Sequence, residues 1–254
     1  MTPKISMLLP ARGRPTYLKE SVMSVFDLAA KPDDVEVIVR LDDNDPFLQD
    51  EIRVLQAWPK HVQVYTGERL GYSRMHLYYE GLAERAQGKW IHLWNDDIVA
   101  ATKDWDLLLD EAPAFSVQFP RRDVCEHADP TLPVVGRGIY EAMGHLSQNA
   151  YCDAWISDIS AFAGTSITRN DIVFHHHRLD DATLREQNDG GKEWARFGTQ
   201  RAERRADMDK VMAAPGWASR YDGWEVEVEY HPVDYINLAA GEAKAHAVQL
   251  RGRK

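Results

Sequence analysis

The chain has 254 residues, of which 44% are hydrophobic and 28% are charged. This length and apolar content allow a substantial buried core, and a single domain is the default expectation. The formal net charge is -10, from 40 Asp and Glu against 30 Lys and Arg. Such a surface disfavours non-specific binding to nucleic acid, which needs positive charge.

The first hundred residues alternate between strand-like and helix-like patterns. Short apolar runs predict strands at residues 5–10, 35–41, 61–65 and 90–94. Helices are predicted at residues 15–28, which open with a proline, and at residues 72–86, which carry apolar side chains on one face. This alternation predicts right-handed crossovers and an α/β fold, Rossmann-like, with a mostly parallel open sheet flanked by helices.

The second part of the chain has a looser pattern. Prolines and glycines are frequent in residues 101–150, so we expect a loop-rich segment there. Beyond it, the pattern predicts a helix at residues 151–162, a short strand at 172–177, a charged helix at 200–212 and a half-exposed strand at 224–230.

Two adjacent acids end the fourth predicted strand, in Asn95-Asp96-Asp97. In an open α/β sheet ligands gather at the carboxyl ends of strands, so these acids can hold a divalent cation against a phosphorylated ligand. Asn and Asp are also common in turns and helix caps, and an ordinary polar turn is the alternative.

The first two predicted strands end in oppositely charged loops. Arg12 and Arg14 follow the first strand, and Asp42 closes the second. Facing each other across one sheet edge, an arginine can pair with phosphate and Asp42 can accept from a base or ribose; a solvated loop and a simple turn are the alternatives. The sequence has no Gly-x-Gly-x-x-Gly, phosphate loop, His-Glu-x-x-His or Gly-x-Ser-x-Gly motif.

Two later segments carry further candidate groups. Strand alternation would place His175 and His177 on one face and His176 on the other, and a carboxylate with imidazole suits Mn²⁺ at least as well as Mg²⁺. A surface histidine tract is the alternative. Asp153 or Asp158 could take a proton from the hydroxyl group of a substrate. The alternatives are that Asp153 caps the following helix and that Asp158 faces solvent.

Taken together, Pro10-Ala-Arg-Gly-Arg-Pro15, Asp42-Asp43-Asn44 and Asn95-Asp96-Asp97 resemble the nucleotide-sugar half of GT-A fold glycosyltransferases, family 2 in particular. The later Asp153-Ala-Trp155 and histidine run are similar to phage and bacterial members. The chain departs from the family pattern at Glu80, where asparagine is frequent, and at Asn95, where aspartate is frequent.

The resemblance implies a metal-dependent inverting glycosyltransferase that moves a sugar from a nucleoside-diphosphate donor to an acceptor hydroxyl. Asp97 and His175 would hold Mn²⁺ or Mg²⁺, with His177 as the alternative imidazole, and Asp153 would be the catalytic base, with Asp158 as its alternative. The expected donor contacts are Pro10, Arg12, Arg14, Asp42, Arg69 and Asp96.

We expect one domain over residues 1–254. Residues 1–100 would bind the nucleotide sugar, residues 101–235 would hold the acceptor and catalytic half, and residues 236–254 would form a C-terminal tail. The resemblance leaves the acceptor open between a saccharide or lipid-linked acceptor and a hydroxymethylated DNA base. The latter would be held by a basic track of Arg121, Arg122, Arg201, Arg204, Arg205 and the basic C-terminus.

Two other functions fit the same residues, and the sequence also bears on location. A nucleotidyltransferase acting on a sugar phosphate would release pyrophosphate, and a non-catalytic nucleotide-sugar binding protein would show no turnover. No apolar run approaches the length of a membrane span, no export signal is recognised, and Cys125 and Cys152 form no Cys-x-x-Cys pair. We therefore expect a cytoplasmic protein with reduced thiols, or a host-cytoplasmic one if it is phage-encoded.

Overall fold

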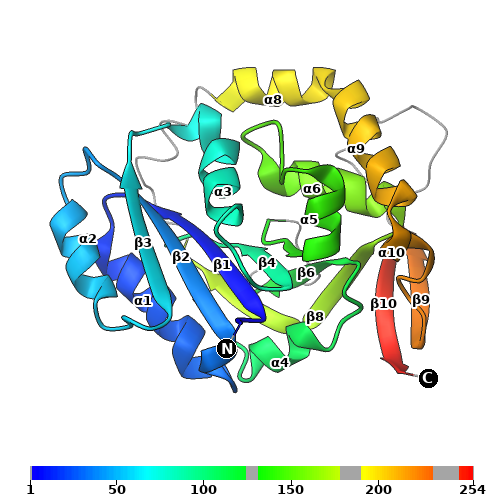
Figure 1. Ribbon diagram of the computed structural model, residues 1–254, viewed down its shortest axis with the longest axis horizontal. Helices are drawn as coiled ribbons and strands as arrows, with labels where there is room; N and C mark the ends of the chain where they lie inside the picture. The colour runs from blue at the N-terminus through cyan, green and yellow to red at the C-terminus, as the bar shows by residue number, and fades with distance from the viewer. Residues whose placement is uncertain (1, 124–130, 178–189, 231–245, 254) are drawn as a thin grey trace.

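A computed structural model describes residues 2–123, 131–177, 190–230 and 246–253 (Figure 1). The strands are β1 (Ile5–Ala11), β2 (Val35–Asp42), β3 (Val62–Gly67), β4 (Trp90–Leu93), β5 (Ile98–Ala100), β6 (Val117–Arg122), β7 (Val134–Gly136), β8 (Ser166–His176), β9 (Trp224–Tyr230) and β10 (His246–Arg253). The α-helices are α1 (Pro15–Leu28), α2 (Leu48–Leu55), α3 (Met75–Ala83), α4 (Trp105–Asp110), α5 (Arg137–Met143), α6 (Cys152–Ala163), α8 (Gly190–Thr199), α9 (Arg201–Ala213) and α10 (Pro215–Ala218), and short 3₁₀ turns lie at Pro32–Asp34 and Tyr72–Arg74.

Within the described residues, the strands form one sheet in the order β3-β2-β1-β4-β7-β6-β8-β10-β9, and β5 pairs with β8. The pairs β3-β2, β2-β1 and β1-β4 are parallel, whereas β4-β7, β7-β6, β5-β8 and β10-β9 are antiparallel. The predicted α/β class with an open sheet is confirmed. Because β1 lies between β2 and β4 in parallel register, the loops after these three strands meet at one edge of the sheet.

Alternating side chains of the central strands fill two separate cores. Met7 and Leu9 of β1 pack on one side of the sheet with α1, while Leu8 packs on the other side with Ile38 and α3. Strand residues two apart share a face, so a parallel strand covered on both sides is mostly apolar on both faces. This explains why the first strands are predominantly apolar.

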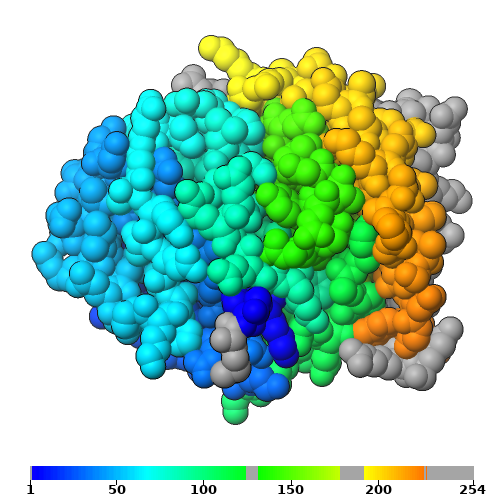
Figure 2. Space-filling view, viewed as in Figure 1, coloured from blue at the N-terminus to red at the C-terminus, as the bar shows by residue number. Residues whose placement is uncertain are grey.

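Helices α3, α5 and α6 cover the sheet face opposite α1 and α2, and α9 packs against both α5 and α6 (Figure 1). In the space-filling view, α8 and α9 lie along the margin beyond α3 and α6 (Figure 2). No helix in the described parts of the chain is long and apolar enough to cross a membrane.

The structure differs from the sequence prediction in the second half. Residues 101–150 contain α4, β6, β7 and α5, although they were expected to be rich in loops. These elements have three to seven residues each, too few for a periodic pattern to emerge. Among the described prolines, Pro113 and Pro133 lie between elements and Pro120 lies at the irregular pairing of β6 with β8. The predicted strand at 172–177 is part of the 11-residue strand β8.

Candidate donor and metal site

The carboxyl edge of β1, β2 and β4 brings the two charged loops and the acidic strand end together. Arg12 and Arg14 belong to the loop between β1 and α1, in which Gly13 has a φ of 74°. This left-handed conformation strongly favours glycine and turns both arginines toward neighbouring strand ends. The sequence-predicted donor residues therefore lie at one edge of the sheet.

Arg14 connects the loop to the acids that follow β4. Its Nε donates to Asp96 Oδ2 at 3.1 Å, its Nη2 contacts the other oxygen of Asp96, and its Nη1 lies 3.4 Å from Asp97 Oδ2. The side chain of Asp96 is 2% exposed, and burial raises its pKa to about 7 although Arg14 opposes the rise. Arg14 thus supplies positive charge to both acids.

Asp97 also faces a histidine on β8. His176 Nε2 lies 3.4 Å from Asp97 Oδ1, and the backbone N–H of His177 donates to the Asp97 carbonyl at 2.9 Å. Burial alone would raise the pKa of Asp97, but His176 and Arg14 outweigh it and lower the pKa below its usual value. The carboxylate is therefore held ionised.

The expected pair of Asp97 with His175 is not formed. Antiparallel pairing of β5 with β8 places His176 opposite Ile98, the residue after Asp97, and turns its ring toward Asp97. His175 instead points to the other side, where its Nδ1 contacts Asp123, and its ring lies 4.5 Å from that of His177. The predicted sharing of one face by His175 and His177 is confirmed, and that face is turned away from Asp97.

The residues fit a cation that is bound together with a ligand. Among the described residues, no three His, Cys, Asp or Glu side chains form a complete metal site. Asp97 Oδ1 is buried and accepts no hydrogen bond within that part of the chain, and His176 Nε2 lies beside it. Mg²⁺ and similar cations commonly take one or two protein ligands and complete their coordination with substrate phosphates and water.

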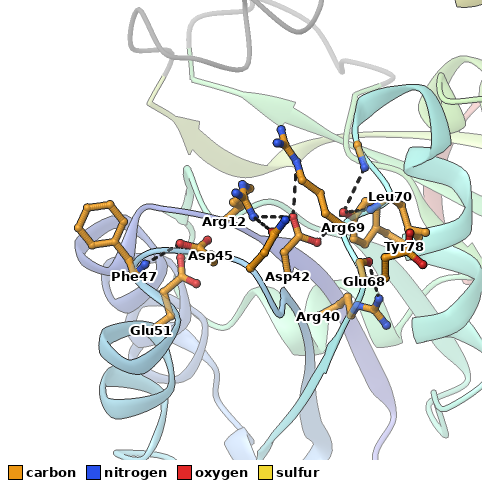
Figure 3. A network of polar contacts seen from close by, with 12 residues as sticks. Arg12, Arg40, Asp42, Asp45, Phe47, Glu51, Glu68, Arg69, Leu70 and Tyr78 are labelled. Carbon is orange, nitrogen blue, oxygen red and sulfur yellow. Dashed lines mark hydrogen bonds and ion pairs between the residues drawn. The ribbon is translucent and has the colours of Figure 1, made fainter.

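Asp42, the acid that closes β2, is the centre of a second cluster (Figure 3). Arg12 Nη1 lies 3.0 Å from Asp42 Oδ2 and 2.9 Å from Asn44 Oδ1, and Arg69 Nε lies 4.0 Å from Asp42 Oδ2. The Tyr78 hydroxyl donates to Asp42 Oδ1 at 2.6 Å. Asp42 is thus fixed in orientation at the same edge, and Pro10 is half-buried at the end of β1.

The structure separates the two candidate bases. Asp158 is fully buried on α6, and its Oδ2 is paired with Arg204 Nε of α9 at 2.9 Å, so it is out of reach of any acceptor. Asp153 is only half-buried, in the first turn of α6. Burial raises the pKa of Tyr79 well above its usual value, and the charges of Asp153, Asp97 and Asp96 add to that rise.

Sequence reasoning missed several contributors to this site. Tyr79 belongs to the apolar face of the helix predicted at residues 72–86, yet its hydroxyl donates to Asn95 Oδ1 at 2.8 Å and fixes the strand end. Glu51 is fully buried and accepts from the backbone N–H of Arg14 at 3.2 Å, which anchors the arginine loop. In the sequence, Tyr79 looks like an ordinary packing residue of an amphipathic helix, and Glu51 looks like an ordinary solvated residue of α2. No local pattern indicates that either side chain supports the site.

Glu80, the departure from the family pattern, has a structural role. It accepts hydrogen bonds from the Tyr140 hydroxyl at 2.9 Å and from the Leu146 backbone at 3.0 Å. Its carboxylate therefore ties α3 to α5 and to the segment that follows.

No family model matches the sequence, and no curated protein matches it either. Similar structures were found among solved proteins. One is the mannosyltransferase PcManGT from Pyrobaculum calidifontis in complex with GDP-Man and Mn²⁺, with a TM-score of 0.63 and 13% identity over 87% of this chain and 74% of that one.

Two further similar structures carry nucleotides. S. aureus TarS residues 1–349 in complex with UDP-GlcNAc has a TM-score of 0.55 and 11% identity, over 86% of this chain and 72% of that chain. GalNAc-T7 with UDP, GalNAc and Mn²⁺ has a TM-score of 0.56 and 13% identity, over 81% of this chain and 55% of that chain. At such low identity the likeness establishes the fold, and the chain has the GT-A fold of these glycosyltransferases.

Proposed function

We propose that this chain is a metal-dependent glycosyltransferase that moves a sugar from a nucleoside-diphosphate donor to an acceptor hydroxyl. The observation that carries the proposal is the meeting of Arg14, Asp96, Asp97 and His176 at the carboxyl edge of a GT-A sheet, beside Asp42. Structures of similar fold contain nucleotide sugars or nucleotides, two of them with Mn²⁺. Family 2 membership of the phage or bacterial type is part of the same proposal and depends on the sequence motifs alone.

Each residue has a role that its environment supports. Asp42, oriented by Tyr78, would accept a hydrogen bond from the nucleoside, with Pro10 and Arg69 at the margin of that site. Asp97 with His176, the imidazole that the register of β8 favours over His175, would hold Mn²⁺ or Mg²⁺ against the diphosphate. Bound there, the cation would neutralise charge on the departing nucleoside diphosphate.

The chain's own groups would carry the remaining steps. Arg12 and Arg14 would pair with phosphate oxygens, and Asp96 would contact the ribose. Asp153 would accept the proton of the acceptor hydroxyl as that oxygen attacks the anomeric carbon, with inversion in a single displacement. Tyr151 lies two residues before Asp153 in the chain, and its ring is 4.8 Å from that of Trp194 and 6.2 Å from that of Tyr72, so a ring-shaped acceptor suits this side.

A saccharide acceptor is favoured over a hydroxymethylated base in DNA. Arg204, one member of the expected basic track, is 2% exposed and paired with Asp158, and Arg205 is paired with Asp209. These pairings remove one member of the expected basic track from the surface and neutralise another, and the net charge of -10 also disfavours a phosphate backbone. A test with both acceptor classes decides between them.

The experiment compares wild type with Asp97→Asn and Asp153→Asn, using a panel of nucleotide sugars with and without Mn²⁺. Asp97→Asn should lose Mn²⁺-dependent donor binding in calorimetry, whereas Asp153→Asn should keep donor binding and lose transfer by about 10²-fold or more. Full transfer by Asp97→Asn would contradict the metal assignment.

Product analysis separates the two rival functions. Release of a nucleoside diphosphate supports glycosyl transfer, whereas pyrophosphate released from a nucleoside triphosphate would identify a nucleotidyltransferase. Tight donor binding, with neither hydrolysis nor transfer to any acceptor of a broad panel, would favour a non-catalytic nucleotide-sugar binding protein.

A further inference from the structure

Arg14 places a positive charge beside Asp96 and Asp97, the two acids that follow β4. It contacts both oxygens of Asp96, and it approaches Asp97 on the oxygen opposite the one that faces His176. Two adjacent carboxylates, 2% and 14% exposed, are thereby balanced by one guanidinium of which 25% is exposed. An arginine fork suits this bridging because its donors are fixed in one plane.

The loop that carries Arg14 is itself anchored. The backbone N–H of Arg14 donates to Glu51, a fully buried side chain on α2. Gly13, which has a left-handed backbone conformation, directly precedes Arg14. The backbone of Arg14 therefore stays in place while the long side chain can exchange partners. Arg12 on the same loop has a different target, because it pairs with Asp42 and Asn44.

We propose that Arg14 is an internal counter-cation of this site, which competes with the divalent metal for Asp97 until a donor diphosphate arrives to accept it. This inference rests on the proposed function and deepens it. A divalent cation placed on Asp97 shares that carboxylate with the guanidinium, and like charges at such short range repel strongly. The phosphate oxygens of a donor offer Arg14 charge-assisted hydrogen bonds like those that it makes with carboxylates. Donor binding is therefore accompanied by release of the Arg14 side chain from Asp97.

The consequence is coupling between the two ligands. Metal binding to the free protein is weak, and nucleoside diphosphate strengthens it; by linkage, the metal strengthens nucleotide binding to the same degree. Removing the charge of Arg14 strengthens metal binding without nucleotide and reduces the coupling. A residue that only positioned the acids would have the opposite effect, because its loss would disorder the metal ligands.

The test measures free Mn²⁺ by electron paramagnetic resonance during titration of the full chain, alone and with UDP or GDP. Arg14→Gln should bind Mn²⁺ without nucleotide more tightly than wild type by about tenfold, since the competing charge is gone. The matched control is Arg53→Gln, which removes the same charge from the surface of α2, where Arg53 is exposed and pairs only with Asp50 among the contacts of the described residues, and it should stay within about twofold of wild type.

Folding of each variant is checked by near-ultraviolet circular dichroism, to which the buried Trp94 beside this site contributes. A folded Arg14→Gln that binds Mn²⁺ no more tightly than wild type overturns the inference. If Arg14→Gln does not fold, Arg14→Lys replaces it, because one ammonium group cannot bridge both acids as the guanidinium fork does. Arg14→Lys must then bind Mn²⁺ more tightly than wild type, and equal or weaker binding is the contrary result.

The same titration distinguishes failure of the inference from failure of the proposed function. Wild-type protein that binds Mn²⁺ neither alone nor with either nucleotide contradicts the proposed function. Wild-type protein that binds Mn²⁺ together with nucleotide, with no gain in Arg14→Gln, contradicts only the role of Arg14.

Discussion

His92 gives the stability of this protein a dependence on pH that can be isolated by one substitution. It lies on β4 with no exposed surface, and its ring centroid is 5.0 Å from Trp94 and 5.3 Å from Phe174. Neither ring nitrogen makes a hydrogen bond of normal geometry within the described parts of the chain. Burial lowers the pKa of His92 to about 3, although the Leu132 backbone opposes the shift.

The sign follows from proton linkage. In the unfolded chain the histidine has its ordinary pKa of about 6.5, so between that pH and about 3 the unfolded state binds more protons than the folded state. The free energy of unfolding is therefore unaffected by protonation of His92 above the unfolded pKa of about 6.5, and it falls as the pH drops from there toward about 3. From pH 7 to pH 5 the loss amounts to about 2 kcal/mol.

The assay is urea unfolding of wild type and His92→Leu at a series of pH values between 7 and 5. Leucine has a similar volume and cannot take up a proton, so the variant should lose about 2 kcal/mol less than wild type across this range. His61→Leu is the control, since His61 lies near the surface beside Asp33 and its replacement leaves His92 in place. Parallel loss of stability in wild type and His92→Leu would refute the reasoning.

Two further substitutions test contacts described above. Arg204→Met leaves Asp158 buried without its partner and should cost about 3–5 kcal/mol in urea unfolding, whereas the double variant Asp158→Leu/Arg204→Met should recover most of that loss; a small cost for Arg204→Met would contradict the buried pair. Tyr78→Phe removes the donor to Asp42 and should weaken nucleotide binding about 10-fold in calorimetry, by about 1–1.5 kcal/mol; unchanged affinity would show that Asp42 needs no such orientation.

Much of the first half of the molecule could be predicted from local sequence. Strands β1, β2 and β4 are predominantly apolar because both of their faces are buried, and each is followed by a polar loop. Since parallel strands end at the same edge, the meeting of Arg12, Arg14, Asp42, Asp96 and Asp97 followed from their order along the chain. The short elements in residues 101–150 could not be predicted, because a strand of three residues shows no period.

The partners of each side chain could not be predicted either. The sequence predicted that Arg12 or Arg14 would pair with phosphate, and in the structure each is already paired with carboxylates. Sequence spacing does not predict which distant residue an arginine pairs with, because a side chain on one loop can reach several neighbours. The same holds for Glu51, whose contact with the Arg14 backbone joins residues 37 positions apart.

The amino-acid sequence by itself determined the α/β class and the edge of the sheet where charged groups collect, because both depend on burial patterns within single strands and helices. Only the tertiary structure decided which histidine faces Asp97 and which aspartate of α6 is accessible. Register between β5 and β8 selects His176, and the packing of α6 against α9 buries Asp158 while Asp153 stays half-buried. Register and helix packing are set by contacts between distant segments, and local sequence does not contain them.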